Sequence, residues 1–256
     1  MNEKERDDVN LAVLIDADNI SYQYVKPMMD EIALYGNPTV KRIYGDWTKQ
    51  NMNGWKTVLL DYAITPIQQF GYTYGKNATD TALIIDAMDI LYQNDIDGFC
   101  LVSSDSDFTK LATRLREAGK QVIGIGEQKT PNAFIAACNR FIYLEILNYE
   151  DREEEAKAHI KPHTPPASRP MTTNIKKVDQ ELTKLIYSFT EQLADDSGWA
   201  FLGDVGNMLL KTAPSFDSRN YGYAKLSKLI RDLPEIEIDE RPTSSSNVKH
   251  IYIRHH

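Results

Sequence analysis

Four aspartates and one asparagine in the first half of the chain fall where apolar segments give way to polar residues. Asp16 ends the apolar run LAVLID, and Asn19 follows three residues later. Asp105 and Asp107 follow the run GFCLVS, and Asp80 opens a long periodic segment. If these runs are parallel strands, their carboxyl ends lie along one edge of a sheet, where such sheets bind ligands. We therefore expect these side chains to converge on one site.

Carboxylates gathered this closely favour the binding of a hard cation. Without one, their repulsion would drive at least one carboxylate to take up a proton. Mg²⁺ prefers oxygen ligands at about 2.0–2.1 Å, and such an ion can activate water and neutralise charge at a phosphodiester. The pattern predicts a Mg²⁺ site whose ligands are Asp16, Asp80, Asp105 and Asp107.

Other catalytic chemistries lack their residues in this region. The first 158 residues contain no histidine, which removes a serine–histidine triad, a histidine zinc site and the paired-histidine chemistry of metal-free ribonucleases. Cys100 and Cys138 each lie in an apolar run. We expect two buried thiols there, and not a disulfide or a metal pair.

Each acidic residue also has a purely structural interpretation. Asp105 or Asp107 could only cap the helix that follows, and Asp80 could be a first-turn residue favoured by the helix dipole. Asp16 and Asp18 could be ordinary loop residues. Capping gives no reason for distant aspartates to converge, so the set as a whole favours the metal site.

Several neighbouring residues could support such a site. Lys76, in the segment GKNATD, could meet a substrate phosphate as a mobile charge, or be an ordinary loop lysine. Asp86 could support the site from behind, whereas Asp89 is expected at the surface. Trp47 and Trp55 could stack on bases, but we favour a role as buried anchors for their loop.

The spacing of apolar residues predicts strands alternating with helices over the first domain, residues 1–150. The strand-like runs are apolar throughout, as in parallel strands covered on both faces. This predicts a doubly wound α/β fold with a mainly parallel sheet and helices on both faces, although spacing leaves the strand order open. Gly36 and Gly119 are expected to end two helices. The expected strands are residues 11–16, 40–47, 98–104, 121–126 and 141–146, and the expected helices are residues 25–35, 55–62, 80–92, 107–119 and 131–140.

Two further regions follow. Residues 151–177 are charged and then proline-rich, as in an exposed linker. Residues 178–256 contain helical patterns followed by the strand-like segments EIEIDE and NVKHIYIR. Three helices and a hairpin predict a small winged-helix domain.

Basic residues gather on the expected last helix of this small domain. Its apolar residues are spaced to face a core, which leaves Lys225, Lys228 and Arg231 to share another face. Such a face can contact phosphates, and Lys211 and Arg219 could extend it. A solvated helix face is the alternative.

The bulk properties limit the class of protein. The chain has 256 residues, a formal net charge of −8 and a pI of about 5.2. This balance argues against a general DNA-coating protein, which would be basic, but not against an enzyme whose carboxylates hold cations at nucleic acid. No apolar run could cross a bilayer and the first residues are charged, so we expect a cytoplasmic protein without a secretory signal.

Three segments resemble the NYN domain of the PIN-like nuclease superfamily, in its bacterial LabA-like branch: LAVLIDADNI, GKNATDTALIIDAMDILY and GFCLVSSDSDFTKLATRLREAGKQVIGIGE. The resemblance covers nearly all of residues 11–145, and the motifs IDADN, KxxxD and SSDSDF in that order are specific. It implies a PIN-like fold, an acidic Mg²⁺ or Mn²⁺ site and RNA cleavage. It places the family's acidic residues on Asp16, Asp80, Asp105 and Asp107, with Asn19 beside them.

One departure from the family pattern concerns a second metal position. Family members often carry an acidic residue before the last strand, where this chain has Asn139 and Arg140. We therefore expect one firm metal position and a weaker second one.

The tail resembles the OST-HTH, or LOTUS, domain. The run P-x-F-D-x-R-x-Y-G-Y-x-K-L occupies Pro214–Leu226. The resemblance implies a winged helix that binds RNA or, in some members, a protein.

The residues and the resemblance together predict a metal-dependent endoribonuclease whose tail supplies affinity for RNA. Two alternatives stay open. A haloacid-dehalogenase-like phosphatase also requires two aspartates two residues apart after a strand, as in Asp16 and Asp18, but has no need of the DSD segment. A non-catalytic RNA-binding or scaffold protein could carry the acidic site as a structural remnant.

Overall fold

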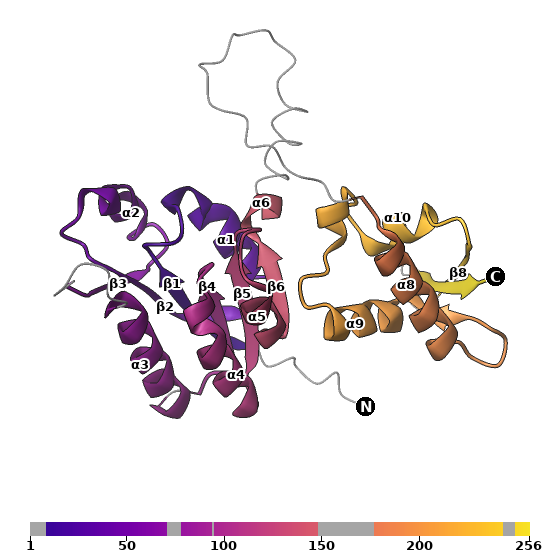
Figure 1. Ribbon diagram of the computed structural model, residues 1–256, viewed down its shortest axis with the longest axis horizontal. Helices are drawn as coiled ribbons and strands as arrows, with labels where there is room; N and C mark the ends of the chain where they lie inside the picture. Colours follow the sequence, from indigo (N-terminus) through magenta and orange to yellow (C-terminus); the bar gives the residue numbers. More distant parts are fainter. Residues whose placement is uncertain (1–8, 71–77, 94, 148–176, 243–248) are drawn as a thin grey trace, which may run out of the picture. The chain divides into compact units, whose positions relative to one another are not determined.

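The computed structural model describes residues 9–70, 78–93, 95–147, 177–242 and 249–256. The chain divides into two compact units, Met1–Pro165 and Pro166–His256 (Figure 1). The expected linker, residues 151–177, lies outside the described residues except for Lys177. Among the described residues, no helix has the length and apolar character that crossing a membrane requires.

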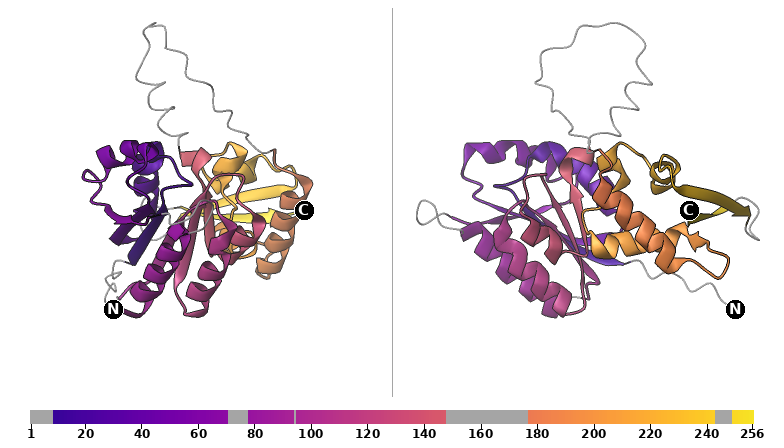
Figure 2. Two further views of the ribbon diagram at one scale, coloured as in Figure 1. Left: turned by 60° about the vertical axis from the view of Figure 1, so that its left-hand side comes forward. Right: turned by 45° about the vertical axis from the view of Figure 1, so that its right-hand side comes forward.

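The first unit is built on a parallel sheet of six strands in the order β3-β2-β1-β4-β5-β6. Helices lie on both sides of this sheet, which Figure 2 shows from two further directions. The strands are β1 (Asn10–Asp16), β2 (Asn37–Gly45), β3 (Thr65–Gln68), β4 (Gly98–Val102), β5 (Gln121–Gly126) and β6 (Arg140–Tyr143). The helices are α1 (Val25–Ile32), α2 (Asn53–Val58), α3 (Ala78–Gln93), α4 (Thr109–Glu117), α5 (Asn132–Ala137) and α6 (Leu144–Leu147), with the short 3₁₀ turns η1 (Tyr22–Tyr24), η2 (Gln50–Met52) and η3 (Ser106–Phe108).

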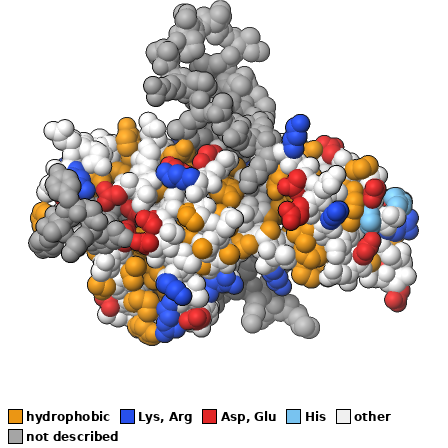
Figure 3. All heavy atoms as spheres, in the orientation of Figure 1, with side chains coloured by type: hydrophobic (Ala, Val, Ile, Leu, Met, Phe, Trp, Pro, Cys, Tyr) orange, Lys and Arg blue, Asp and Glu red, His pale blue; other side chains and the backbone are white. Residues whose placement is uncertain are grey.

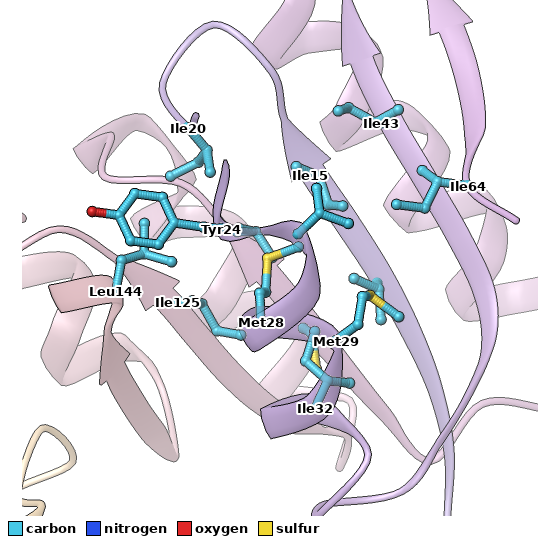
Figure 4. Packing of buried hydrophobic residues seen from close by; sticks show 14 of the residues in the cluster. Ile15, Ile20, Tyr24, Met28, Met29, Ile32, Ile43, Ile64, Ile125 and Leu144 are labelled. Atoms are coloured by element: carbon cyan, nitrogen blue, oxygen red, sulfur yellow. The ribbon is translucent and has the colours of Figure 1, made fainter. Parts of the chain in front are cut away.

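The two faces of the sheet pack into two separate apolar clusters. Successive side chains of a strand point to opposite faces, so Val13 and Ile15 of β1 pack with α1 and α2, whereas Leu14 packs with α3, α4 and α5. Figure 4 shows the first cluster, in which Met28 and Ile32 of α1 lie against the strands. Each fully buried side chain of this kind contributes about 1.5–3 kcal/mol. This double burial confirms the doubly wound α/β prediction.

Two local predictions differ from the structure. Strand β3 was not predicted because Thr65–Gln68 is a short and largely exposed edge strand, where a proline is tolerated. The last strand ends at Tyr143, and Leu144–Leu147 form the helix α6 although their apolar pattern continues that of the strand. Burial marks neither boundary, because Thr65–Gln68 is largely exposed and the buried residues of β6 continue into α6.

The two glycines expected to end helices behave differently. Gly119 has a φ of 79° and follows Ala118, the C-cap of α4, as predicted for a helix stop. Helix α1 already ends at Ile32, so the role predicted for Gly36 was wrong. A Cβ on Gly36 would lie 2.3 Å from the carbonyl oxygen of Val9, and this close backbone approach explains the glycine.

Both cysteines are buried and free, which confirms the prediction of two buried thiols. Burial raises the pKa of Cys100 and of Cys138 to about 12. Neither thiol is therefore a reactive nucleophile near neutral pH.

The second unit is a small domain of three helices and a three-stranded antiparallel sheet in the order β7-β9-β8. Its core includes Ile186, Val205, Leu229 and Ile253, all completely buried. The helices and hairpin agree with the winged-helix prediction, and the short strand β7 is an addition to it. The elements are α8 (Gln180–Leu193), β7 (Ala200–Phe201), α9 (Leu202–Thr212), η4 (Ser218–Tyr221), α10 (Leu226–Arg231), β8 (Ile236–Pro242) and β9 (Lys249–His255).

Candidate metal centre

The strand order creates a switch point between β1 and β4. From β1 the chain moves outward to β2 and β3, and later returns to place β4 on the other side of β1. Ligands of open α/β sheets bind at the carboxyl ends of strands at such a point. Asp16 ends β1, and Asp105 lies three residues after β4 ends at Val102. Figure 3 shows acidic side chains gathered on one face of this unit.

Asp16 is a buried and fully engaged carboxylate. Its side chain accepts hydrogen bonds from Asn19 Nδ2 at 2.5 Å, from Ser103 Oγ at 2.9 Å and from the backbone N–H of Asp18 at 3.1 Å. Burial raises the pKa of Asp16, while these hydrogen bonds act in the opposite direction. Because Ser103 follows β4, Asp16 ties together the ends of the two strands at the switch point.

Three other aspartates form a compact cluster. Asp80, Asp105 and Asp107 each offer a carboxylate oxygen, and these atoms lie within 4.8 Å of one another. Asp80 lies in the first turn of α3, and Asp105 caps η3 by accepting the backbone N–H of Asp107 at 2.9 Å. The capping interpretation of Asp105 is thus correct but incomplete, because the cap uses only one of its two oxygens. We call these three residues the aspartate cluster.

Asp80 carries the electrostatic consequence of this arrangement. Its pKa is raised to about 6, first by burial and then by the negative charges of Asp16, Asp105 and Asp107. The charge of Asp16 is therefore close enough to raise the pKa of Asp80. Within the part of the chain that the structure describes, the carboxylate oxygens of Asp16 do not belong to the aspartate cluster. The distant aspartates do converge.

The donor atoms of the aspartate cluster suit a hard divalent cation. All are carboxylate oxygens, which Mg²⁺ and Mn²⁺ accept as ligands and which softer metals do not favour. Burial and then repulsion raise the pKa of Asp80, and a cation there would offset the repulsion. The residues present therefore fit an ion of this class.

Three further residues were considered near the site, namely Asp86, Asp89 and Lys76. Asp86 accepts hydrogen bonds from the Arg42 guanidinium and the Tyr44 hydroxyl of β2, so these partners occupy both of its oxygens. Asp89 is exposed, as expected. Lys76 lies outside the described residues.

The two tryptophans are placed as loop anchors. Trp55 is 2% exposed and packs in the core. Trp47 is partly buried, and its Nε1 donates to the backbone oxygen of Ile67 at 2.9 Å. Neither placement favours base stacking.

Asn139 and Arg140 lie at the start of β6, at the opposite edge of the sheet from the aspartate cluster. Arg140 begins β6, and Asn139 pairs through its backbone and side chain with Val122 near the start of β5. The strands of this six-stranded sheet are all parallel, so both residues lie at the sheet edge opposite the carboxyl ends. The departure from the family pattern at these positions therefore does not bear on the site.

Three residues of the site region were not predicted. Ser103 bonds Asp16, Thr79 Oγ1 donates to Asp18 Oδ2 at 3.3 Å, and Lys49 Nζ lies 3.9 Å from Asp18 Oδ1. Ser103 could have been found, because a small hydroxyl residue directly precedes the SDSD segment. No sequence signal connects Lys49 with the site.

The basic residues of the second unit divide into two groups. Arg219 donates from Nε and Nη2 to the two oxygens of Asp217, at 3.1 and 2.8 Å, and Arg231 pairs with Glu240. Both arginines therefore already have an acidic partner within the unit, and Arg231 stays about half exposed in its pair. Lys211, Lys225 and Lys228 are exposed.

The Asp16 environment also bears on the phosphatase alternative. Asp16 is 1% exposed, and both of its oxygens accept hydrogen bonds. A nucleophilic aspartate must reach the substrate phosphorus with a free oxygen. This geometry does not favour that chemistry.

Comparisons with solved structures find chains that are similar to parts of this one. An uncharacterized protein from Nitrosomonas europaea is 34% identical, and the match covers 38% of this chain and 92% of that one with a TM-score of 0.29. Residues 175–257 of a protein from Chromobacterium violaceum are 37% identical, and that match covers 32% and 86% with a TM-score of 0.26. A protein of unknown function from Vibrio parahaemolyticus is 19% identical, covering 54% and 94% with a TM-score of 0.45. The curated proteins contain no match.

Family comparisons match both units in the expected order. The NYN domain matches residues 10–145, which is more than half of the chain. The OST-HTH/LOTUS domain matches residues 173–248. The chain therefore belongs to the NYN domain family and carries an OST-HTH/LOTUS domain after its NYN domain.

Proposed function

We propose that the chain is a metal-dependent endoribonuclease. The observation that carries this proposal is the meeting of Asp80, Asp105 and Asp107 at the switch point of a NYN domain. NYN domains are related to PIN-like nucleases, and the OST-HTH/LOTUS domain suggests RNA as the substrate. The products would carry 5′-phosphate and 3′-hydroxyl ends.

The aspartate cluster would hold one Mg²⁺ or Mn²⁺ ion. When bound, this cation would supply an activated water and neutralise charge at the phosphodiester. Asp16 would support the cluster without binding the ion. Its negative charge acts on Asp80. Its hydrogen bonds with Asn19 and Ser103 hold the ends of β1 and β4 in place. This division of roles follows from the burial of Asp16 and the partial exposure of Asp80 and Asp105.

The second unit would supply affinity for RNA. Its exposed lysines Lys211, Lys225 and Lys228 can contact phosphates without breaking an ion pair that holds the fold. Since both units belong to one chain, RNA bound by one unit is held at a raised local concentration near the other.

The test is cleavage of labelled single-stranded and structured RNA by the full chain with Mg²⁺ or Mn²⁺, with a chelator as control. We expect cleavage that the chelator abolishes, and a loss of at least roughly 100-fold in Asp80→Asn and Asp105→Asn. Asp89→Asn is the matched control, because it removes an exposed carboxylate from the same helix as Asp80.

Two results would contradict the proposal. RNA binding without cleavage under any of these conditions would indicate a non-catalytic RNA-binding protein. Cleavage by Asp80→Asn at the wild-type rate would remove the aspartate cluster from the reaction.

A further inference from the structure

Lys49 brings a positive charge to the edge of the acidic site. Its Nζ lies 3.9 Å from Asp18 Oδ1, and 53% of its side chain is exposed. Lys49 directly precedes η2 in the loop that follows β2. It thus reaches the site from a different element than the aspartates do.

The loop that carries Lys49 is firmly tied to the edge strand β3. Asp46 Oδ1 accepts the backbone N–H of Thr48 at 3.2 Å, the Thr48 hydroxyl at 2.6 Å and Gln68 Nε2 at 3.0 Å. Gln68 Oε1 in turn accepts the backbone N–H of Trp47 at 3.0 Å. The backbone N–H of Lys49 closes the turn on the Asp46 carbonyl at 3.1 Å. The backbone at Lys49 is therefore held in place while its side chain stays exposed.

Asp18 connects Lys49 with the aspartates of the site. The backbone N–H of Asp18 donates to Asp16 Oδ1 at 3.1 Å, and its Oδ2 accepts the hydroxyl of Thr79 at 3.3 Å. Thr79 directly precedes Asp80. Asp18 alone therefore separates the Lys49 ammonium from Asp16, and Asp18 and Thr79 separate it from Asp80.

The chemistry of Lys49 suits a phosphate at this place. A phosphodiester approaching several carboxylates meets repulsion, which a nearby cationic side chain reduces. The lysine ammonium has three donors on a flexible stem, and its long, exposed contact with Asp18 can be exchanged for another anion. Arg42, by contrast, is bonded to Asp86.

We propose that Lys49 binds a non-bridging oxygen of the RNA phosphate at the acidic site, and that Asp18 is the positioning residue that holds the Lys49 ammonium there before RNA arrives. This inference rests on the proposed endoribonuclease function. It assigns a substrate contact to the loop after β2.

The first test compares kcat/KM for RNA cleavage by full-length Lys49→Ala, Lys49→Arg and Lys56→Ala. Losing a hydrogen bond to a charged group lowers kcat/KM roughly 10–100-fold, which we expect for Lys49→Ala. Lys49→Arg should retain most of the activity because it keeps the charge. Lys56→Ala should match the wild type, since Lys56 is an exposed lysine of α2 whose ammonium bonds Asn53. Equal rates for Lys49→Ala and wild type would overturn the inference.

A second test separates phosphate binding from simple neutralisation of Asp18. Asp18→Asn keeps an oxygen for Thr79 but removes the charge that holds Lys49, so it should lower kcat/KM by less than Lys49→Ala does, because the lysine itself remains. If Lys49 contacts the phosphate, the double variant Asp18→Asn/Lys49→Ala stays as slow as Lys49→Ala. If the double variant recovers the wild-type rate, Lys49 only offsets the charge of Asp18, and the inference is wrong.

These outcomes are distinct from failure of the proposed function. If the wild type does not cleave RNA with Mg²⁺ or Mn²⁺, the endoribonuclease proposal itself fails. If the wild type cleaves, Lys49→Ala should keep the wild-type rise in Tm on adding Mn²⁺, because Lys49 is not a metal ligand. Loss of that rise would overturn the assignment of Lys49 to the substrate.

Discussion

Asp16 and Asp80 show how environment gives the same residue type different roles. Asp16 is buried, but three hydrogen bonds stabilise its charged form. Asp80 is also partly buried, but it faces the negative charges of Asp16, Asp105 and Asp107. The first is suited to hold strand ends together, and the second to accept a cation that relieves repulsion.

The raised pKa of Asp80 predicts that its charge destabilises the metal-free protein. The pKa is about 6 in the fold and 3.8 ordinarily, so protonated Asp80 stabilises the fold below about pH 4, and this stabilisation is lost as pH rises through about 6. Asp80→Asn should therefore raise the free energy of unfolding at about pH 8 by on the order of 1 kcal/mol, since water screens part of the repulsion at this partly exposed group.

Urea unfolding in the presence of a chelator measures this effect, with Asp89→Asn as the exposed control on the same helix. At about pH 4 the advantage of Asp80→Asn over the wild type should vanish. An Asp80→Asn variant less stable than the wild type at about pH 8 would show that the carboxylate is not repelled by its neighbours.

At the scale of elements, the sequence predicts the parts of the site that follow from burial. The run LAVLID is apolar on both faces, so its strand and the end of that strand at Asp16 could both be predicted. The long helix that carries Asp80 was predicted from the periodic spacing of its apolar residues. Its position beside β1 depends on the strand order, which local spacing does not contain.

Other features depend on side-chain direction and could not be predicted. Asp107 joins the aspartate cluster while Asp16 is held by hydrogen bonds behind it, although both were expected as ligands. The contact of Lys49 with Asp18 requires β2 and β1 to be neighbours and the loop after β2 to fold back. Strand β3, which anchors that loop, was missed because it is short and exposed.

The close packing of Gly126, at the end of β5, against Ser103, after β4, allows a test of whether these strand ends support the metal site. A Cβ on Gly126 would lie 2.5 Å from the carbonyl oxygen of Ser103 and 2.8 Å from Thr130 Oγ1. Gly126→Ala should therefore shift Ser103, whose hydroxyl bonds Asp16, and cost about 1–3 kcal/mol of stability. We expect weaker Mn²⁺ affinity, measured by isothermal titration calorimetry.

Gly119→Ala is the control for this change. Its φ of 79° makes alanine strained there, but no atom lies within 4 Å of the added Cβ. It should lower stability without changing Mn²⁺ affinity. Equal Mn²⁺ affinities for Gly126→Ala and Gly119→Ala would show that the Ser103 contact does not support the site.

At the scale of the whole molecule, the net charge of −8 does not conflict with RNA binding. The first unit concentrates carboxylates where a cation can offset them, and the second presents exposed lysines. Under the proposed function, the charges are divided between a catalytic role in the first unit and an affinity role in the second. The two roles should respond separately to mutation.

Lys225→Ala/Lys228→Ala in the full chain tests this division. We expect a higher KM for RNA, an unchanged kcat, and a salt dependence of binding reduced by about 0.7 in slope for each lost phosphate contact. Lys184→Ala, which removes an exposed lysine of α8, is the control. A lower kcat with unchanged KM would place these lysines in the reaction rather than in RNA binding.

The most direct measurement of the central claim is anomalous diffraction from crystals of the full chain soaked in Mn²⁺. The proposal predicts a peak between Asp80, Asp105 and Asp107 that is absent from Asp80→Asn crystals treated in the same way. No peak at the aspartate cluster, under conditions in which the protein cleaves RNA, would contradict it.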